Sequence, residues 1–277
     1  MVQSLVKGAL VEDLNKEGDI TSRALIPATR TAEASISNRK AGVLCGLDFA
    51  LAAFAQVDST LDLTPHKKDG DTLAVNDKIL TIKGNARAIM EGERTAINFI
   101  GHLSGIASAT AHLAALIKHT SAKLYDTRKT TPNLRVVEKY AVHCGGGNNH
   151  RIGLYDGILI KDNHIAVVGG VQQALDAVRD IGKNMVVEIE VDTLSQLDTA
   201  IAAGTDVVLL DNMPPDILRQ AIARIKEAGA NITTEASGGI NAASIVAIAE
   251  SGVDYVSVGS ITHSAPTLDV GLDISIN

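Results

Sequence analysis

The sequence predicts an α/β protein with two parts: an α+β layer region up to about residue 105, and an incomplete (β/α) barrel after it. Three observations support this division. Strand and helix patterns are loosely interleaved in the first part, short apolar runs alternate regularly with Ala/Leu-rich segments in the second, and polar residues follow the ends of those apolar runs. With 277 residues, 45% of them hydrophobic, the chain can bury a large core.

The first part combines two periodicities. Residues 34–37, 61–64 and 79–82 alternate between apolar and polar side chains, which predicts strands. Residues 47–57 and 86–103 repeat their apolar side chains with a helical period. Strands interleaved with helices in this way are typical of a layered α+β domain.

The second part repeats a strand followed by a helix about every 20–35 residues, which predicts a parallel sheet. The expected strands are 122–125, 158–160, 185–189, 207–210, 232–234 and 255–258. The expected helices are 134–143, 171–181, 193–203, 215–228 and 242–252. An open sheet gathers its chemistry at one switch point, whereas polar residues follow several strands here, which favours a barrel. About 160 residues are too few for a barrel of ~250, so we expect an incomplete one.

Composition excludes several classes of protein. Lys+Arg 25 against Asp+Glu 32 gives a net charge of −7, and aromatic residues make up 3%, so we expect no nucleic-acid partner. The sequence has no apolar run near the ~18 residues of a membrane span, and its start turns acidic too early for a secretory signal. The two cysteines, Cys45 and Cys144, form neither a disulfide framework nor a metal motif in sequence. We therefore expect a cytoplasmic enzyme with no membrane partner.

Cationic residues gather at the expected strand ends of this acidic protein. Arg128, Lys129, Arg151 and Lys161 stand at strand ends or beside glycines, which favours a binding site for anions. Arg135 and Lys139 also belong to this stretch of sequence but fall inside an amphipathic helix. For these two, a solvated helix face and an anion site are equally good interpretations.

A glycine run at 145–147 precedes His150 and Arg151. Glycines let the backbone turn sharply or approach a ligand, and neighbouring N–H groups can bind anions. A glycine triplet alone also fits a flexible loop. The His-Arg pair, followed by a strand that ends at Lys161, favours the binding interpretation.

Acidic and glycine residues follow the remaining strands. Glu188 and Glu190 alternate on one strand and Asp211 ends the next, so these carboxylates either bind Mg²⁺ or balance the cations. After the last two strands come Ser237 with Gly238 and Gly239, and Gly259 with Ser260, where barrel enzymes often bind phosphate. The residues alone leave open a phosphoryl-linked transferase, a decarboxylase, or a Schiff-base aldolase that uses Lys161 or Lys129.

Several segments closely resemble the quinolinate phosphoribosyltransferases, from about residue 10 to the C-terminus. They are EGDIT, GERTAINFIGHLSGIA, DTRKTTPNLRVVEKYAVHCGGGNNHRIGLYDGILIKDNHI, EIEVDTLSQL, LLDNM, TEASGGIN and VSVGSITHSAP. The resemblance implies a glycosyltransferase (pentosyltransferase), the carboxylating nicotinate-nucleotide diphosphorylase. Quinolinate and phosphoribosyl pyrophosphate would give nicotinate mononucleotide, pyrophosphate and CO₂ in de novo NAD biosynthesis.

The resemblance also implies the architecture and the cofactor. It implies an N-terminal α/β sandwich domain over residues 1–105, with residues 265–277 returning to it, and an incomplete α/β barrel over 106–264. It further implies Mg²⁺ and a homodimer whose sites are shared between subunits. Arg94, which by sequence alone is a surface residue of a helix, would reach into the partner's site.

The matching positions imply roles for individual residues. Lys129, Lys161, Glu190 and Asp211 would be catalytic, and the two acids would face the ribose hydroxyls and Mg²⁺, contacting the metal indirectly with the substrate phosphates. The clamp on quinolinate and pyrophosphate would comprise Arg128, Lys129, His150, Arg151, Lys161 and the partner's copy of Arg94. The 5′-phosphate end would be lined by Ser237, Gly238, Gly259 and His263.

Two positions depart from the family pattern. Asn133 replaces a glycine in a turn, where asparagine tolerates the left-handed conformation, and His143 replaces a common arginine.

Three other functions compete with the one that the resemblance implies. They are a ModD-like relative of molybdenum-transport operons, a nicotinate phosphoribosyltransferase and a non-catalytic metabolite-binding protein. The intact Arg-Lys and His-Arg motifs argue against the first, and the crowding of cations between Arg128 and Lys161 favours a dicarboxylate over nicotinate. A non-catalytic protein should have lost strand-end charges.

Overall fold

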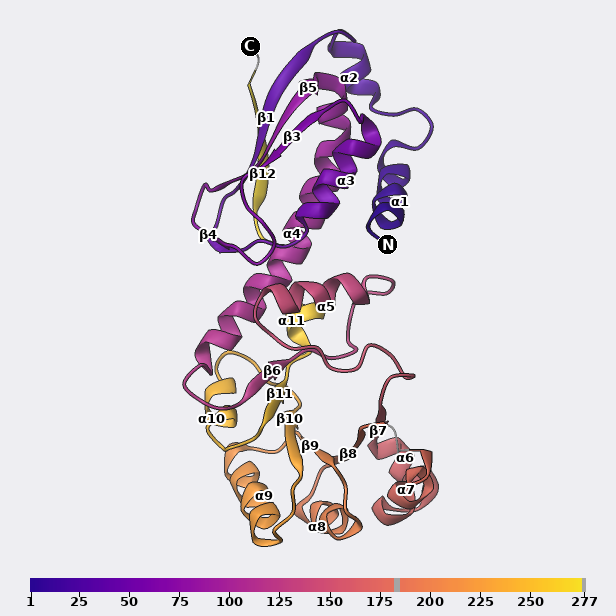
Figure 1. Cartoon of the computed structure of the whole chain (residues 1–277), viewed down its shortest axis with the longest axis vertical. Coiled ribbons are helices and arrows are strands. Elements are labelled where there is room, and N and C mark those ends of the chain that lie inside the picture. Colours follow the sequence, from indigo (N-terminus) through magenta and orange to yellow (C-terminus); the bar gives the residue numbers. More distant parts are fainter. Residues whose placement is uncertain (182–184, 276–277) are drawn as a thin grey trace. The chain divides into compact units, whose positions relative to one another are not determined.

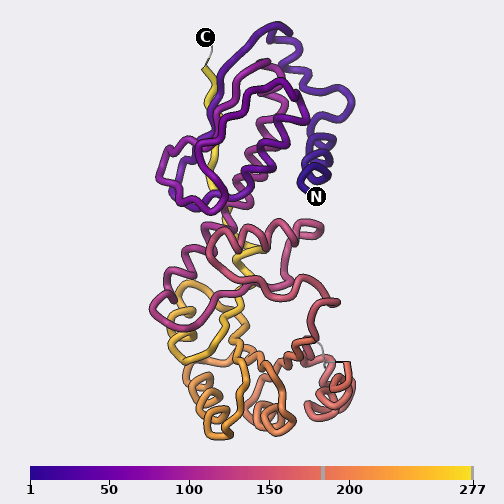
Figure 2. Tube along the Cα trace, viewed as in Figure 1, coloured from indigo at the N-terminus to yellow at the C-terminus, as the bar shows by residue number. Residues whose placement is uncertain are grey.

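The computed structural model describes residues 1–181 and 185–275. The chain divides into two compact units, and each is described by itself (Figures 1 and 2). The N-terminal unit comprises residues 1–109, residues 143–145 and the C-terminal stretch from Ala265. The barrel unit comprises residues 110–142 and 146–264.

An antiparallel sheet forms one layer of the N-terminal unit. Its strands lie in the order β12 (Val270–Ser275), β1 (Thr31–Asn38), β5 (Lys78–Asn85) and β3 (Asp62–Pro65). A separate two-stranded ladder pairs β2 (Gly42–Val43) with β4 (Thr72–Leu73). Figure 1 shows β12 in yellow beside β1 in indigo, so the end of the chain completes a sheet built from its beginning.

Helices form the other layer of this unit: α1 (Val2–Leu14), α2 (Ile20–Leu25), α3 (Leu47–Val57) and α4 (Ala86–Leu116), the last of which belongs to this unit up to Ala109. The expected bounds of α3 are confirmed. Helices α1 and α2 were not predicted, and for residues 265–277 a return to this domain was expected but not the strand β12. The rings of Phe49 on α3 and Phe99 on α4 stack with their centroids 4.7 Å apart. A Cβ at position 92 would lie 2.6 Å from the Phe54 ring, so Gly92 allows α4 to approach α3 closely.

Helix α4 continues to Leu116, and the expectation that it ends near residue 103 is wrong. Its later glycines are sites of close packing rather than helix ends, since a Cβ at Gly105 would lie 2.3 Å from the backbone oxygen of Pro266. By length and composition α4 could cross a membrane. Half of its most apolar window is buried inside the protein, and Ile100 and Leu103 are fully buried. Its apolar side chains therefore belong to the core.

A six-stranded parallel sheet forms the centre of the barrel unit. Its order is β6 (Lys123–Tyr125), β11 (Tyr255–Ser257), β10 (Thr233–Ser237), β9 (Val207–Asp211), β8 (Val187–Val191) and β7 (Ile158–Ile160). The first and last strands of the unit pair, β6 with β11, while β6 and β7 are the two edges within the described residues. The predicted incomplete barrel is thus confirmed.

Seven helices connect or follow these strands in the described ranges. They are α5 (Arg135–Cys144), α6 (Asp162–Val168), α7 (Val171–Val178), α8 (Leu194–Ala203), α9 (Pro215–Glu227), α10 (Ile245–Ala249) and α11 (Ser260–His263). Most expected bounds shift by a residue or two. The largest difference is at α10, expected over 242–252 and found at Ile245–Ala249. The short helices α6 and α11 were not predicted.

Candidate active site

A cavity of about 510 Å³ lies at the carboxyl ends of the parallel strands, within the barrel unit. Its lining residues are Thr127, Arg128, Lys129, His150, Arg151, Leu159, Lys161, Glu190, Leu209, Asp211, Asn212, Glu235, Ser237, Gly238 and Gly239. Strands in a parallel barrel all present these ends to one face, which is where such proteins place their active sites.

Strand register sets the height of the functional side chains. Ser237 on β10 pairs with Asp211 on β9, so both lie at one level of the sheet. Ile160 on β7 pairs with Ile189 on β8, which brings the next residues, Lys161 and Glu190, to one level. The Lys161 Nζ atom lies 2.9 Å from the Glu190 carboxylate in consequence.

The segment after the glycine run adds to the open edge of the sheet. Asn148 donates its backbone N–H to the Leu124 carbonyl and accepts the N–H of Asp126, forming a parallel bridge beside β6. At Gly147 a Cβ would lie 2.7 Å from Thr110 and 2.8 Å from Val142, so the close approach requires glycine there. This path delivers His150 and Arg151 to the cavity.

A buried ion pair anchors the same segment. Asp126 and Lys139 have fully buried side chains, and Lys139 donates to the Asp126 carboxylate and, at 2.8 Å, to the His150 carbonyl. Asp126 also accepts the His150 backbone N–H at 2.8 Å and the Asn149 amide at 2.7 Å. Burial raises the pKa of Asp126 and lowers that of Lys139, and in each case the attraction of the partner opposes the shift.

Arg135 and Lys139 fit neither of their two interpretations, a solvated helix face or an anion site. Lys139 is 1% exposed and bonds to protein groups, so it lies neither on a solvated face nor in the cavity lining. Arg135 donates to the Thr130 hydroxyl and to the carbonyls of Ile152 and Arg128. Both side chains hold the surrounding loops in place.

His150 lies between two buried carboxylates. Its Nε2 atom is 3.1 Å from Glu188 and 3.4 Å from Glu235. Burial alone would lower the pKa of His150, but hydrogen bonds and attraction to Glu188 and Glu235 outweigh it and raise the pKa to about 10. The Arg151 backbone N–H lies 2.8 Å from Nδ1 and opposes a proton there. A neutral His150 would keep this hydrogen bond but leave the buried Glu188 and Glu235 carboxylates without a cation, which costs more free energy than one hydrogen bond. We therefore assign a charged imidazolium to His150.

The raised pKa predicts how the stability due to His150 depends on pH. Below its unfolded pKa near 6.5 the stabilisation is fully present, and it is lost as the pH rises toward the folded pKa of about 10. Wild type should therefore exceed His150→Gln in free energy of unfolding most at pH 6 and least at pH 10. Chemical denaturation at pH 6, 8 and 10 measures the difference. His119→Gln, which alters an exposed pair with Glu250, is the control. A constant difference across this range would contradict the assignment.

Two arginines, Arg128 and Arg151, line the cavity close enough to repel each other. Among the described residues, the Arg128 Nε atom is buried with no hydrogen-bond partner. Arg151 donates to the Gly157 carbonyl at 2.7 Å, and burial followed by repulsion from Arg128 lowers the pKa of Arg151. Like charges held together and a buried donor left open are features of a site that receives an anion.

Two carboxylates of the cavity lining, Glu190 and Asp211, belong to a group of three acidic residues. One ligand oxygen each of Glu190, Asp192 and Asp211 lies within 4.8 Å of the others. Burial, followed by repulsion from Glu190, raises the pKa of Asp211. Oxygen ligands of this kind suit Mg²⁺, which would relieve the repulsion, so these residues fit that ion.

The end of β10 forms a tight glycine turn. Gly238 and Gly239 have φ angles of +99° and +60°, in the region that favours glycine. A Cβ at Gly238 would lie 2.2 Å from the Asn212 side-chain oxygen, so the turn approaches β9 too closely for any side chain. The Asn212 backbone N–H donates to the Ser237 carbonyl at 2.9 Å and fixes the turn beside Asp211.

Most of the predicted site residues lie together in this cavity. The lining contains Arg128, Lys129, His150, Arg151, Lys161, Glu190, Asp211, Ser237 and Gly238. Gly259 and His263 are not among the lining residues but lie beside Lys129, which is one of them. A Cβ at Gly259 would be 3.1 Å from Lys129 Cδ and 3.3 Å from His263 Nε2. Arg94 is exposed on α4 in the N-terminal unit and is not among the lining residues.

Thr127, Asn212 and Glu235 also line the cavity and were not predicted, whereas Gly239 belongs to the predicted strand-end segment. A carboxylate inside the buried strand β10 was the available signal for Glu235.

The prediction that Asn133 adopts the left-handed conformation in its turn is confirmed, with φ at +66°. His143 lies exposed at the end of α5 and is not part of the cavity lining.

Both parts of the sequence match one family. The profile described as "Quinolinate phosphoribosyl transferase, C-terminal domain" matches residues 106–273, and the profile for the N-terminal domain matches residues 19–104. The chain belongs to the quinolinate phosphoribosyl transferase family. The predicted resemblance is confirmed.

Relatives match this member of the quinolinate phosphoribosyl transferases over its whole length. The probable carboxylating nicotinate-nucleotide pyrophosphorylase of Bacillus subtilis is 42% identical over 277 residues, covering 100% of this chain and 94% of the relative. The carboxylating nicotinate-nucleotide pyrophosphorylase of Mycobacterium leprae is 41% identical over 271 residues, covering 97% and 95%. The solved nicotinate-nucleotide pyrophosphorylase of Francisella tularensis has a TM-score of 0.93 at 42% identity, covering 99% and 96%.

Proposed function

We propose that this protein transfers phosphoribosyl from phosphoribosyl pyrophosphate to quinolinate with decarboxylation, giving nicotinate mononucleotide, pyrophosphate and CO₂ in de novo NAD biosynthesis. The observation that carries the proposal is the pair of crowded arginines, Arg128 and Arg151, with a buried donor left open toward an anion. Family membership and the names of the relatives support the same reaction.

The distribution of ion pairs favours a substrate with two carboxylates. Lys161 is paired with Glu190, and His150 is held by Glu188 and Glu235. Within the described residues, Arg128, Lys129 and Arg151 form no ion pair with a protein carboxylate and remain available for the substrate. Arginine forks bind carboxylates in two-pronged fashion, so these side chains can fix the plane of a pyridine dicarboxylate.

Positioning and electrostatics would supply the catalysis. As pyrophosphate leaves, the ribose C1 gains positive charge, and the Glu190 and Asp211 carboxylates at one end of the cavity would stabilise it. The clamped carboxylates hold the pyridine nitrogen in line to attack that carbon. The resulting pyridinium withdraws electrons, so the carboxylate next to nitrogen leaves as CO₂, and the electron pair left on that ring carbon takes up a proton from water to give nicotinate mononucleotide. Lys129 and Lys161 would balance the charge of the pyrophosphate and carboxylate groups.

Glu190 and Asp211 would hold Mg²⁺ together with the substrate phosphates, and Asp192 completes the group of oxygens. The ion would neutralise charge on the departing pyrophosphate. The Ser237–Gly239 turn would contact the 5′-phosphate through its backbone and hydroxyl groups, with Gly259 and His263 beside Lys129 at the neighbouring strand end.

We place the enzyme in the cytoplasm.

We further propose a homodimer in which the exposed Arg94 of each subunit completes the partner's site. Mixing inactive Arg94→Ala and Lys161→Ala proteins should restore about a quarter of wild-type activity after subunit exchange at equal amounts, because one site in each mixed dimer is intact. A mixture of Arg151→Ala and Lys161→Ala is the matched control, since every site then carries one defect. If neither mixture recovers activity, although differently tagged subunits verify that exchange has taken place, the active sites are not shared between subunits.

Substrate preference tests the reaction itself. The enzyme should form nicotinate mononucleotide from phosphoribosyl pyrophosphate and Mg²⁺ when given quinolinate, and no product when given nicotinate. Product from nicotinate alone would retain the transferase class but refute the two-carboxylate clamp. No product from either compound, with folded protein, would refute the proposed function and favour a binding protein or the molybdenum-operon relative.

A further inference from the structure

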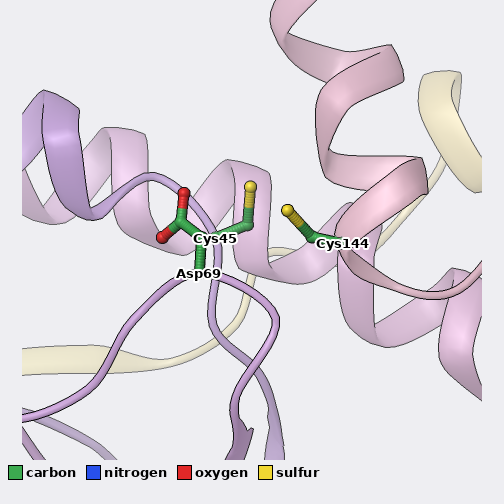
Figure 3. A group of neighbouring side chains, drawn as sticks. All are labelled: Cys45, Asp69 and Cys144. Atoms are coloured by element: carbon green, nitrogen blue, oxygen red, sulfur yellow. The ribbon is translucent and has the colours of Figure 1, made fainter.

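A second group of ligating side chains lies outside the cavity, in the N-terminal unit. Cys45 precedes α3, Asp69 lies between β3 and β4, and Cys144 ends α5 within the stretch 143–145 assigned to this unit. Their sulfur and carboxylate oxygen atoms lie within 4.8 Å of one another. Figure 3 shows the two sulfur atoms facing each other, with the Asp69 carboxylate beside Cys45.

The group is held in place by hydrogen bonds from its surroundings. Cys45 donates its backbone N–H to the Ser104 hydroxyl at 2.9 Å, and that hydroxyl donates back to the Cys45 carbonyl at 3.0 Å. The Asp69 carboxylate accepts the N–H groups of Gly46 and Leu47, each at 3.0 Å. Metal-binding carboxylates are typically oriented by such bonds, which leave other lone pairs free for an ion.

The ligand types select a class of cation. Two sulfurs and one oxygen suit Zn²⁺ and similar thiophilic ions, whereas Mg²⁺ prefers oxygen alone. Ligands held at ~2.0–2.3 Å from one tetrahedral ion are about 3.3–3.8 Å apart, so small side-chain adjustments would suffice here. The carboxylate beside the two sulfurs attracts a divalent cation, and binding of that cation would displace the thiol protons.

We propose that Cys45, Asp69 and Cys144 form a structural site for a thiophilic divalent cation of the Zn²⁺ type, with its fourth position open to water. Asp69 and Cys144 are only partly buried, so water can reach that side of the group. The ion would link the segment before α3, the β3–β4 connection and the end of α5 within the N-terminal unit. This site does not depend on the proposed transferase reaction.

Cobalt binding to the full chain tests the site, because Co²⁺ coordinated by thiolates has a strong charge-transfer absorption in the near ultraviolet. The chain contains only two cysteines, so the absorption can arise from no other residues. Reduced, metal-free protein should develop this band with one equivalent of Co²⁺, and Zn²⁺ should displace it. Zn²⁺ should also raise the melting temperature of the wild-type protein.

Variants separate the site from adventitious binding. Cys144→Ser, at a half-buried position, should lose most of the band and the Zn²⁺-dependent rise in melting temperature, and Cys45→Ser should do the same. Asp69→Asn should weaken binding at least tenfold, while Asp62→Asn, an exposed acid of the same unit, should not. Absence of the band in wild type, an unchanged band in Cys144→Ser, or a disulfide between the two cysteines in place of metal binding would each overturn the proposal.

Discussion

Replacing Arg151 by alanine should lower kcat/KM for quinolinate at least about 100-fold, because the change removes a half-buried cation from a clamp on carboxylate. The fold should survive, since the side chain lines the cavity and makes one hydrogen bond, to the Gly157 carbonyl. Steady-state kinetics with quinolinate varied at saturating phosphoribosyl pyrophosphate measures the effect.

Two further variants make this prediction specific. Arg151→Lys keeps the charge but loses the fork, so it should fall between alanine and wild type. Arg179→Ala removes an arginine from an exposed pair with Asp176 and should leave kcat/KM unchanged. If Arg151→Ala keeps more than about a tenth of wild-type activity, its assignment to the clamp is wrong.

Lys139→Met should lower the free energy of unfolding by about 3–5 kcal/mol, because it leaves the Asp126 carboxylate buried without its cation. Activity should fall as well, since the pair anchors His150. Urea denaturation of wild type and variant measures the loss of stability.

A double variant distinguishes an unpaired charge from poor packing. Asp126→Asn combined with Lys139→Met removes both charges and should regain much of the lost stability. Lys83→Met breaks an exposed pair with Glu33 and should change the free energy of unfolding by less than about 1 kcal/mol. A double variant no more stable than Lys139→Met alone would refute the unpaired-charge explanation.

Sequence periodicity was sufficient to predict the barrel unit, apart from the short helices α6 and α11, because its strands and longer helices carry their own local patterns. The six strands are short apolar runs, and polar residues that follow several of them or the glycine run line the cavity, because parallel strands share one carboxyl edge. The clamp residues Arg128, Arg151 and Lys161 could be found in this way.

Long-range packing explains what the sequence did not predict. Strand β12 pairs with β1, more than 230 residues away in the chain, and Gly105 of α4 packs against Pro266 instead of ending the helix. Lys139 has the helical position of a surface residue, but Asp126 draws it inside. Glu235 pairs with His150 across the sheet, which no spacing between the two residues indicates.

The most direct test of the proposed function follows one labelled carboxyl group. Quinolinate carrying ¹⁴C in the carboxyl next to nitrogen, incubated with the enzyme, phosphoribosyl pyrophosphate and Mg²⁺, should release one labelled CO₂ for each nicotinate mononucleotide formed. Omission of phosphoribosyl pyrophosphate should stop the release, because decarboxylation follows formation of the pyridinium. Nucleotide formed with the label retained, or CO₂ released without nucleotide, would contradict the proposed function.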